Sequence, residues 1–235
     1  MKISGSVALV TGANRGLGHA FARALIERGA RTVYAGARDP ATITDSDLVP
    51  VKLDITDAAD VAAAAALCGD VTLLVNNAGV SYDSPLLAAP ALDGARAEME
   101  TNYFGTLAVC RAFAPVLGAN GGGALVNMLS VASFMSFPQI GSYSASKAAA
   151  WSLTNGVRLE LAAQGTLVVG VHAGFIDTDM AARIDQPKIS PIEVARQTFD
   201  AVEAGQLEVL ADGQSRDVKA ALSAELEVLY PALRG

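Results

Sequence analysis

The stretch VALVTGANRGLGHAFARALIERG, residues 7–29, decides how the amino-terminal part of the chain folds. Its four leading apolar residues predict a short buried strand, and the run HAFARALIERG predicts an amphipathic helix that ends at Gly29. Between them the glycines follow the spacing G-x-x-x-G-x-G. Glycine lets the backbone approach a ligand closely, and a helix amino terminus offers free N–H groups and the positive end of its dipole. The stretch therefore predicts a loop that binds a pyrophosphate. A plain glycine-rich turn is the weaker alternative, because a strand and a helix flank the loop as required.

The residues around the next predicted strand, 31–37, indicate which dinucleotide binds. An acidic residue near this position hydrogen-bonds the ribose 2′-hydroxyl of NAD, whereas an arginine takes the 2′-phosphate of NADP. Arg38 is a fork-shaped donor suited to a phosphate, and Arg15 in the glycine loop can reach the same group from the other side. Asp39 keeps NAD open, but the two arginines favour NADP(H) over NAD(H).

Predicted strands and helices alternate along the whole chain. Further strands are expected at 48–54, 71–75, 124–129, 167–171 and 207–210, and helices at 57–68, 92–117, 143–163, 191–204 and 215–229. This alternation predicts an α/β fold, a doubly wound parallel sheet of about seven strands with helices on both faces. No linker and no repeat divides the sequence, so residues 1–235 are expected to form a single dinucleotide-binding and catalytic domain.

A second stretch, SVASFMSFPQIGSYSASK at 130–147, holds candidates for proton transfer. Tyr143 and Lys147 are four residues apart at the start of a predicted helix, so their side chains lie on one face, one turn apart. A lysine cation favours the phenolate, and we expect it to lower the pKa of Tyr143 from its ordinary value of ~10. Ser130 follows a predicted strand, where its hydroxyl can bond the same oxygen. The pair alone is a weak signal, since chance produces such a spacing. With Ser130 it predicts transfer of one proton to or from a carbonyl or alcohol oxygen.

The motifs TGANRGLG, NNAG at 76–79, Asn102, Ser130 and YSASK at 143–147 together resemble the single-domain branch of the short-chain dehydrogenase/reductase superfamily. The resemblance covers roughly residues 4–212 and implies a Rossmann-like fold and hydride exchange between a nicotinamide cofactor and a carbonyl/alcohol pair. It implies that Tyr143 is the acid/base and that Ser130 orients the substrate oxygen. Lys147 would lower the phenol pKa and hold the nicotinamide ribose, and Asn102 would anchor a water-linked proton relay. The run at 37–39, with Arg15, is similar to the NADPH-preferring carbonyl reductases.

The same resemblance implies a set of cofactor contacts: Gly12, Asn14, Arg15, Gly16, Leu17, Gly18, Arg38, Asp54, Ile55, Asn77, Ala78, Gly79, Tyr143, Lys147, Gly174, Ile176 and Thr178. Asp54 and Ile55 would flank the adenine, and the last two would meet the carboxamide. One departure is Ala173, where the family usually has proline before Gly174. Alanine leaves an N–H donor and a looser turn near the nicotinamide. His172 is expected to be structural rather than catalytic.

Apolar side chains in three predicted loops suggest a pocket for an apolar or aromatic ketone or aldehyde. They are Tyr82, Phe134, Met135, Phe137, Phe175 and Met180. Each phenylalanine can equally be a core or interface residue. The segment 180–190 is short, which predicts a small lid and an open pocket. The helices after Asn102 and Tyr143 have apolar residues on more than one face. In this family such helices build subunit contacts, so a homodimer or homotetramer is expected.

Composition argues against several other classes of protein. The net charge is −7 with no basic cluster, which argues against binding nucleic acid or an anionic membrane. No apolar run reaches the ~18 residues of a transmembrane helix. Two cysteines, Cys68 and Cys110, and no secretory signal favour a reduced, cytoplasmic setting. The histidines and cysteines form no ligand-spaced cluster, so no metal is expected.

The expected function is that of an NADPH-dependent oxidoreductase of the carbonyl reductase type, acting on a small-molecule carbonyl or alcohol substrate. One alternative is a non-catalytic dinucleotide-sensing regulatory protein on the same fold. Such a sensor has no need of Ser130, Tyr143 and Lys147. Another is a lyase or epimerase of the longer family branch, for whose larger carboxyl-terminal domain 235 residues leave no room.

Overall fold

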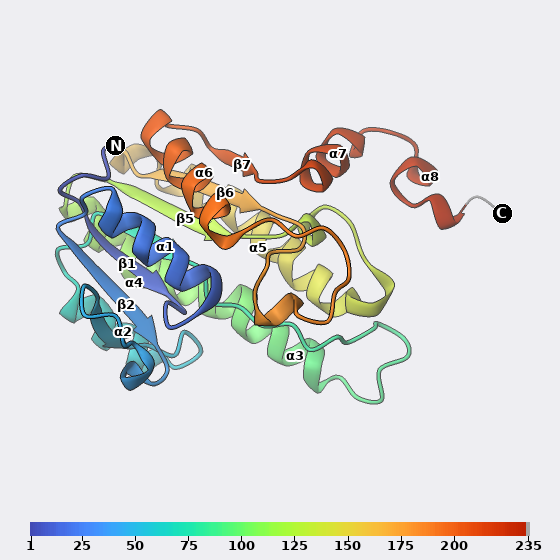
Figure 1. The fold of residues 1–235 in the computed structure, drawn as a ribbon, viewed down its shortest axis with the longest axis horizontal. Helices are drawn as coiled ribbons and strands as arrows, with labels where there is room; N and C mark the ends of the chain where they lie inside the picture. Colours follow the sequence, from blue (N-terminus) through green and yellow to red (C-terminus); the bar gives the residue numbers. More distant parts are fainter. Residues whose placement is uncertain (234–235) are drawn as a thin grey trace.

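All seven strands of the computed structural model, which describes residues 1–233, lie in one parallel sheet (Figure 1). They are β1 (Val7–Thr11), β2 (Thr32–Ala37), β3 (Val49–Lys52), β4 (Leu73–Asn76), β5 (Ala124–Met128), β6 (Leu167–His172) and β7 (Glu208–Leu210). Their order in the sheet is β3-β2-β1-β4-β5-β6-β7, and every neighbouring pair is parallel. The winding direction reverses between β1 and β4. The predicted doubly wound α/β fold is therefore confirmed.

Helices cover both faces of the sheet. On one face α1 (Gly16–Glu27) packs beside α6 (Pro191–Ala204), and the rings of Phe21 and Phe199 meet edge to face at 5.8 Å. On the other face lie α2 (Ala58–Leu67), α4 (Thr106–Ala119) and α5 (Gly141–Glu160), which bury Phe113 and Leu117 among others. Burial on both faces explains why the strands are almost continuously apolar.

Several helices begin where the sequence supplies a capping side chain. Asp57 accepts hydrogen bonds from the backbone N–H groups of the first turn of α2. Ser190 caps α6, whose first residue is proline, and Asp212 caps α7 (Gly213–Ala221). Each cap satisfies backbone donors that have no partner inside the helix. These local signals fix the helix starts without help from the rest of the fold.

Two predicted helices differ from the structure. The helix expected at 92–117 consists of α3 (Asp93–Met99), a π-helical segment (Glu100–Gly105) and α4. The helix expected at 215–229 is broken into α7 and α8 (Leu226–Leu229). Leu226 and Val228 in α8 are exposed, so this short helix buries little apolar surface, and most helical stability in proteins comes from such packing.

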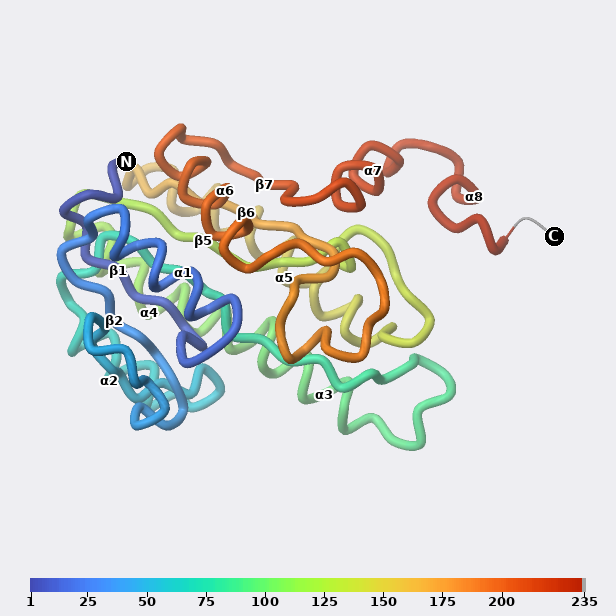
Figure 2. The backbone as a smooth tube through the Cα atoms, in the orientation of Figure 1, coloured from blue at the N-terminus to red at the C-terminus, as the bar shows by residue number. Residues whose placement is uncertain are grey.

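The loops that follow β4, β5 and β6 gather beyond the carboxyl ends of the strands, as Figure 2 shows. Helices α7 and α8 extend away from the sheet on the same side. No helix within residues 1–233 is both long enough and apolar enough to span a bilayer. The same residues contain no group of three or more His, Cys, Asp or Glu side chains placed to hold a metal ion.

Candidate active site

The glycine loop between β1 and α1 is shaped to admit a ligand. Gly12 and Gly16 have positive φ angles of 64° and 53°, a region that L side chains rarely adopt. A Cβ on Gly18 would lie 2.0 Å from the carbonyl oxygen of Gly12, so only glycine fits. No side chain caps the amino terminus of α1, which leaves its first N–H groups free to bind an anion. Of the other loop residues, Asn14 is exposed and Leu17 is buried in the core.

Thr11, at the end of β1, joins this loop to the NNAG segment. Its Oγ1 accepts hydrogen bonds from the backbone N–H groups of Asn77 and Ala78, both at 3.0 Å. The amide of Asn77 donates in return to the carbonyls of Thr11 and Gly12 at 3.0 and 3.2 Å. Thr11 was missed as a site residue, although its place directly before Gly12 is a signal that sequence reasoning could have used.

Asn102 lies in the π-helical segment and holds the next part of the site. Its amide exchanges two hydrogen bonds of 2.9 Å with the backbone of Val80 and donates a third to Ser146 on α5. A Cβ on Gly79 would come within 3.0 Å of the Asn102 amide oxygen and 3.5 Å of Lys147 Nζ. The glycine therefore keeps the space in front of Lys147 open. Such π-helical turns often occur at functional sites.

Lys147 lies in the interior of the site, with only 5% of its surface exposed. Its Nζ donates to the backbone carbonyl of Met128 at 3.0 Å and lies 5.7 Å from the centre of the Tyr143 ring. Burial lowers the pKa of Lys147 from 10.5 to about 8, since the charged form loses its hydration. The predicted pair therefore shares one face of α5, but the lysine has no carboxylate partner within residues 1–233.

The expected lowering of the Tyr143 pKa was wrong for the chain without ligands. Burial raises the pKa of Tyr143 from 10.0 to about 12, a hydrogen bond with Ser130 lowers it, and the charge of Glu98 raises it. Loss of hydration is thus the largest cause, and it outweighs the hydrogen bond with Ser130. At neutral pH the phenol carries its proton and can donate it to an acceptor oxygen.

Ser130 is held firmly at the end of β5. Its Oγ accepts from the backbone N–H of Ala132 at 3.1 Å, and its own N–H donates to the hydroxyl of Ser133, so the two serines form a capping box. The fully buried ring of His172 lies with Nδ1 3.1 Å from the Ser130 carbonyl. His172 therefore packs against the backbone of the candidate residue Ser130 in the interior of the protein.

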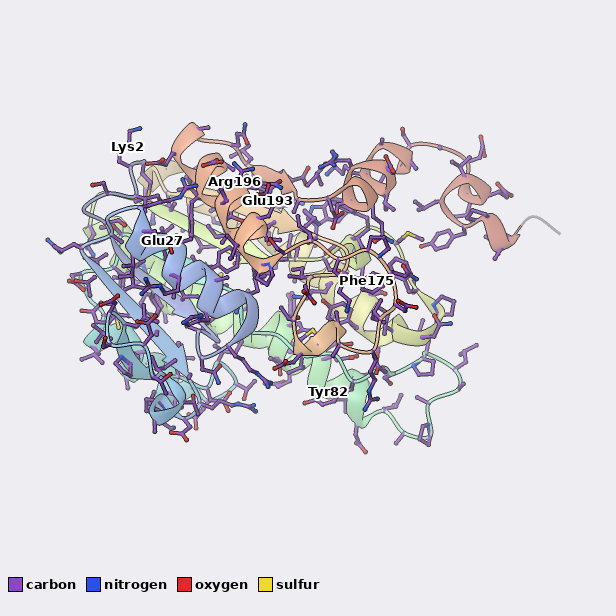
Figure 3. The ribbon with its side chains drawn as sticks, viewed as in Figure 1. Lys2, Glu27, Tyr82, Phe175, Glu193 and Arg196 are labelled. Atoms are coloured by element: carbon purple, nitrogen blue, oxygen red, sulfur yellow. The ribbon has the colours of Figure 1, made fainter. Side chains whose placement is uncertain are left out.

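Phe134 does not belong to a substrate pocket. Only 7% of its surface is exposed, because its ring stacks on His172 at 4.1 Å and meets Trp151 edge to face. Of the other pocket candidates, Tyr82 and Met180 are 56% and 63% exposed, and Met135, Phe137 and Phe175 are half-buried. Figure 3 shows Tyr82 near α3 and Phe175 in the loop after β6, both beyond the carboxyl ends of the strands.

The two arginines expected at the adenosine end are both exposed. Arg15 forms an ion pair with Asp179 at 3.4 Å, and Arg38 has no ion pair within residues 1–233. Asp39 accepts a hydrogen bond from the N–H of Ala41 and so caps its own turn. A cavity of about 200 Å³ adjoins the glycine loop and is lined by Ala13, Asn14, Arg15, His19, Ile43, Thr44 and Asp45.

The remaining predicted contacts lie at the ends of β3 and β6. Asp54 accepts two hydrogen bonds from Thr56, and Ile55 is buried against Gly105. The N–H of Gly174 donates to Asp212 at 2.6 Å, and the hydroxyl of Thr178 donates to the carbonyl of Ile176 at 3.4 Å. Asp212 thus fixes the turn in which alanine replaces the usual proline.

Comparison with known proteins shows what this arrangement corresponds to. The family model for short chain dehydrogenases matches residues 6–189. The chain belongs to the short-chain dehydrogenase family. It is therefore an oxidoreductase by family, and its glycine cradle, with free helix N–H groups beside Gly79 and Lys147, fits the dinucleotide that this fold binds.

This short-chain dehydrogenase is similar in sequence to 2-(R)-hydroxypropyl-CoM dehydrogenase of Xanthobacter autotrophicus. The two are 34% identical over 206 residues, which cover 81% of this chain and 82% of that protein. A solved short chain dehydrogenase from Burkholderia cenocepacia in complex with NADP is 45% identical, with each chain fully covered and a TM-score of 0.95. Another from Burkholderia phymatum, in complex with NAD, is 26% identical, with 99% and 96% covered and a TM-score of 0.85. Both cofactors therefore occur among similar structures.

Proposed function

We propose that this protein is an NADPH-dependent carbonyl reductase that exchanges a hydride between nicotinamide and a carbonyl/alcohol substrate. The observation that carries the proposal is the convergence of the Ser130 hydroxyl on the Tyr143 phenol, with the Lys147 ammonium on the same face of α5. The glycine loop after β1 also lies at the carboxyl ends of the strands. This constellation supports the transfer of one proton to a carbonyl oxygen.

The residues act on the substrate oxygen in complementary ways. The nicotinamide supplies the hydride when it is bound. Tyr143 donates its proton to the oxygen that becomes the alcohol, and the Ser130 hydroxyl holds that oxygen by a hydrogen bond. The phenolate left behind is stabilised by the Lys147 cation, which the carbonyl of Met128 keeps in place at 3.0 Å. Asn102, whose amide is held in place by Val80 and Ser146, is the proposed anchor of a water-linked proton relay.

The preference for NADP(H) over NAD(H) is supported by Arg15 and Arg38 at the adenosine end. Both guanidinium groups are exposed and suited to a phosphate, whereas the Asp39 carboxylate is directed at its own turn. The similar structure from Burkholderia cenocepacia holds NADP, which agrees with this choice.

The proposed substrate is an apolar or aromatic ketone or aldehyde. Exposed apolar side chains, Tyr82 and Met180, come from the loops after β4 and β6, on the side where Tyr143 and Ser130 lie. A pocket of this kind binds mainly by burying apolar area. Phe134 is buried away from this surface, but the other candidate side chains, Tyr82, Met135, Phe137, Phe175 and Met180, are also apolar or aromatic.

We further propose one dinucleotide-binding and catalytic domain over residues 1–235, of which the last two lie outside the described part. Free, buried thiols at Cys68 and Cys110 support a reducing, cytoplasmic setting.

The proposed assembly is a homodimer or homotetramer. It is supported by two exposed apolar side chains, Phe104 on the turn before α4 and Leu159 on α5, through which these helices can form subunit contacts. A monomeric mass by light scattering would reject the assembly.

The test measures loss of NADPH absorbance with acetophenone, benzaldehyde and 2-decanone, and with glyceraldehyde as a polar comparison. We expect turnover of at least one apolar carbonyl, faster with NADPH than with NADH and faster than that of glyceraldehyde. NADPH binding without turnover of any carbonyl would favour the sensing protein instead. Turnover of glyceraldehyde alone would reject the apolar substrate class.

A further inference from the structure

Glu98 is a buried carboxylate near the proposed proton donor that the mechanism above does not use. It lies in α3 with 0% of its surface exposed. Its Oε1 accepts a hydrogen bond of 2.8 Å from the backbone N–H of Tyr82, and its Oε2 accepts one from the Ser142 hydroxyl. Acidic side chains are almost never fully buried unless they are paired. The two donors directed at Glu98 therefore show that the fold pairs this buried carboxylate with specific hydrogen-bond partners.

These contacts join three segments of the site. Ser142 directly precedes Tyr143 in the first turn of α5, and its N–H also donates to the Ser84 carbonyl at 3.2 Å. Tyr82 and Ser84 belong to the loop after β4, where Tyr82 is one of the exposed apolar side chains near the site. Glu98 thus ties the first turn of α5 to the loop that supplies a substrate contact. Each carboxylate oxygen thus has a donor, the backbone N–H of Tyr82 for one and the Ser142 hydroxyl for the other.

The charge of Glu98 also acts on Tyr143. Two charged groups within residues 1–233 bear on the phenol, Lys147 from its own helix and Glu98 from α3, and Ser130 is a neutral hydrogen-bonding partner. A negative neighbour disfavours the phenolate. After burial, which is the larger cause, Glu98 further raises the pKa of Tyr143, while the hydrogen bond with Ser130 lowers it.

We propose that Glu98 is a positioning residue for Tyr143, which fixes the first turn of α5 against the Tyr82–Ser84 loop and places one negative charge beside the phenol. This inference rests on the proposed function, in which Tyr143 is the proton donor. A phenol placed in this way keeps its proton at neutral pH, which is the form that donates to a carbonyl. The arrangement therefore favours reduction at neutral pH and makes oxidation of the alcohol depend on higher pH.

The variant Glu98→Gln separates the charge from the contacts. The glutamine oxygen can accept the N–H of Tyr82, and its amide can donate to the Ser142 oxygen. The Ser142 proton is then free for the Ser84 carbonyl, which lies 2.9 Å from the hydroxyl. Glu100→Gln is the matched control, since Glu100 lies two residues further along and is exposed. Both changes remove one negative charge, but only the first removes a buried one.

The measurement is the pH dependence of 1-phenylethanol oxidation with NADP⁺. We expect the rising limb of Glu98→Gln to move to lower pH by about 0.5–1 unit, because one pKa unit is a tenfold change in the phenolate fraction. At a fixed pH on that limb the rate then rises about 3–10-fold, and Glu100→Gln follows the wild type. Superimposed curves for wild type and Glu98→Gln would overturn the role of the charge.

Ser142→Ala tests the contact without altering Glu98, and it keeps the proposal testable if Glu98→Gln does not fold. It removes the hydroxyl that links the carboxylate to α5, so kcat for acetophenone reduction should fall while KM and the Kd of NADPH change little. A wild-type kcat would overturn the positioning role. An inactive wild type, or an active Tyr143→Phe variant, would instead reject the proposed function on which this inference rests.

Discussion

Replacing both Arg15 and Arg38 by alanine tests the proposed cofactor preference most directly. A hydrogen bond to a charged group contributes about 1.5–3 kcal/mol when it is shielded, but an exposed ion pair contributes only about 0–1 kcal/mol. The Arg15 side chain is 74% exposed, so the lower range applies. Arg15 must also give up its pair with Asp179 to meet a phosphate. We therefore expect at most about 2 kcal/mol for the two together, which is a loss of up to about 30-fold in NADPH affinity.

The assay is the Kd of NADPH and of NADH, from the change in their fluorescence, in wild type, both single variants and the double variant. NADH has no 2′-phosphate, so its Kd should change less than about twofold. Arg31→Ala is the control, because Arg31 is similarly exposed but lies at the amino end of β2, whereas Arg38 follows its carboxyl end. Equal weakening of both cofactors, or tighter binding of NADH than of NADPH by wild type, would refute the phosphate contact.

Two further predictions follow from the residues around the phenol. Tyr143→Phe removes the transferable proton, so turnover should be lost while the Kd of NADPH stays within about twofold; retained turnover would contradict the acid/base role. Burial lowers the pKa of Lys147 to about 8, so the unfolded chain binds more protons than the folded one between about pH 8 and 10.5. The contribution of Lys147 to the free energy of unfolding should therefore rise across that window by about 1–3 kcal/mol in the cofactor-free protein. Burial raises the pKa of the Cys68 and Cys110 thiols to about 12, so their ionisation in the unfolded chain opposes this rise above pH ~9, and ionisation of Tyr143 opposes it above pH ~10. Urea denaturation of wild type and Lys147→Met at several pH values measures this, because the thiols and the phenol are the same in both proteins. The difference in unfolding free energy between the two should grow in favour of wild type from about pH 8 to 10.5, and a constant difference would contradict the lowered pKa of Lys147.

Residue type and spacing were enough to predict the doubly wound sheet and the loops at the carboxyl ends of its strands. The helix predicted at 191–204 has the observed bounds, because Ser190 and Pro191 mark its start within the chain itself. The glycine loop could be recognised for the same reason, since the positive φ angles at Gly12 and Gly16 favour glycine and the close contact at Gly18 excludes any side chain. Such features depend on neighbours along the chain, so residue type and spacing are enough to predict them.

The electrostatics of the site and the surroundings of individual side chains depend on tertiary packing, which residue spacing does not reveal. The spacing of Tyr143 and Lys147 predicted a lowered tyrosine pKa, but burial raises it, because hydration depends on the segments that close over the phenol. Glu98 resembles an ordinary surface residue of a helix until α5 and the Tyr82–Ser84 loop cover it. Phe134 is withdrawn from the pocket by His172 and Trp151. In each case the deciding partners are distant in the sequence, and the energy of a buried group depends on everything packed around it.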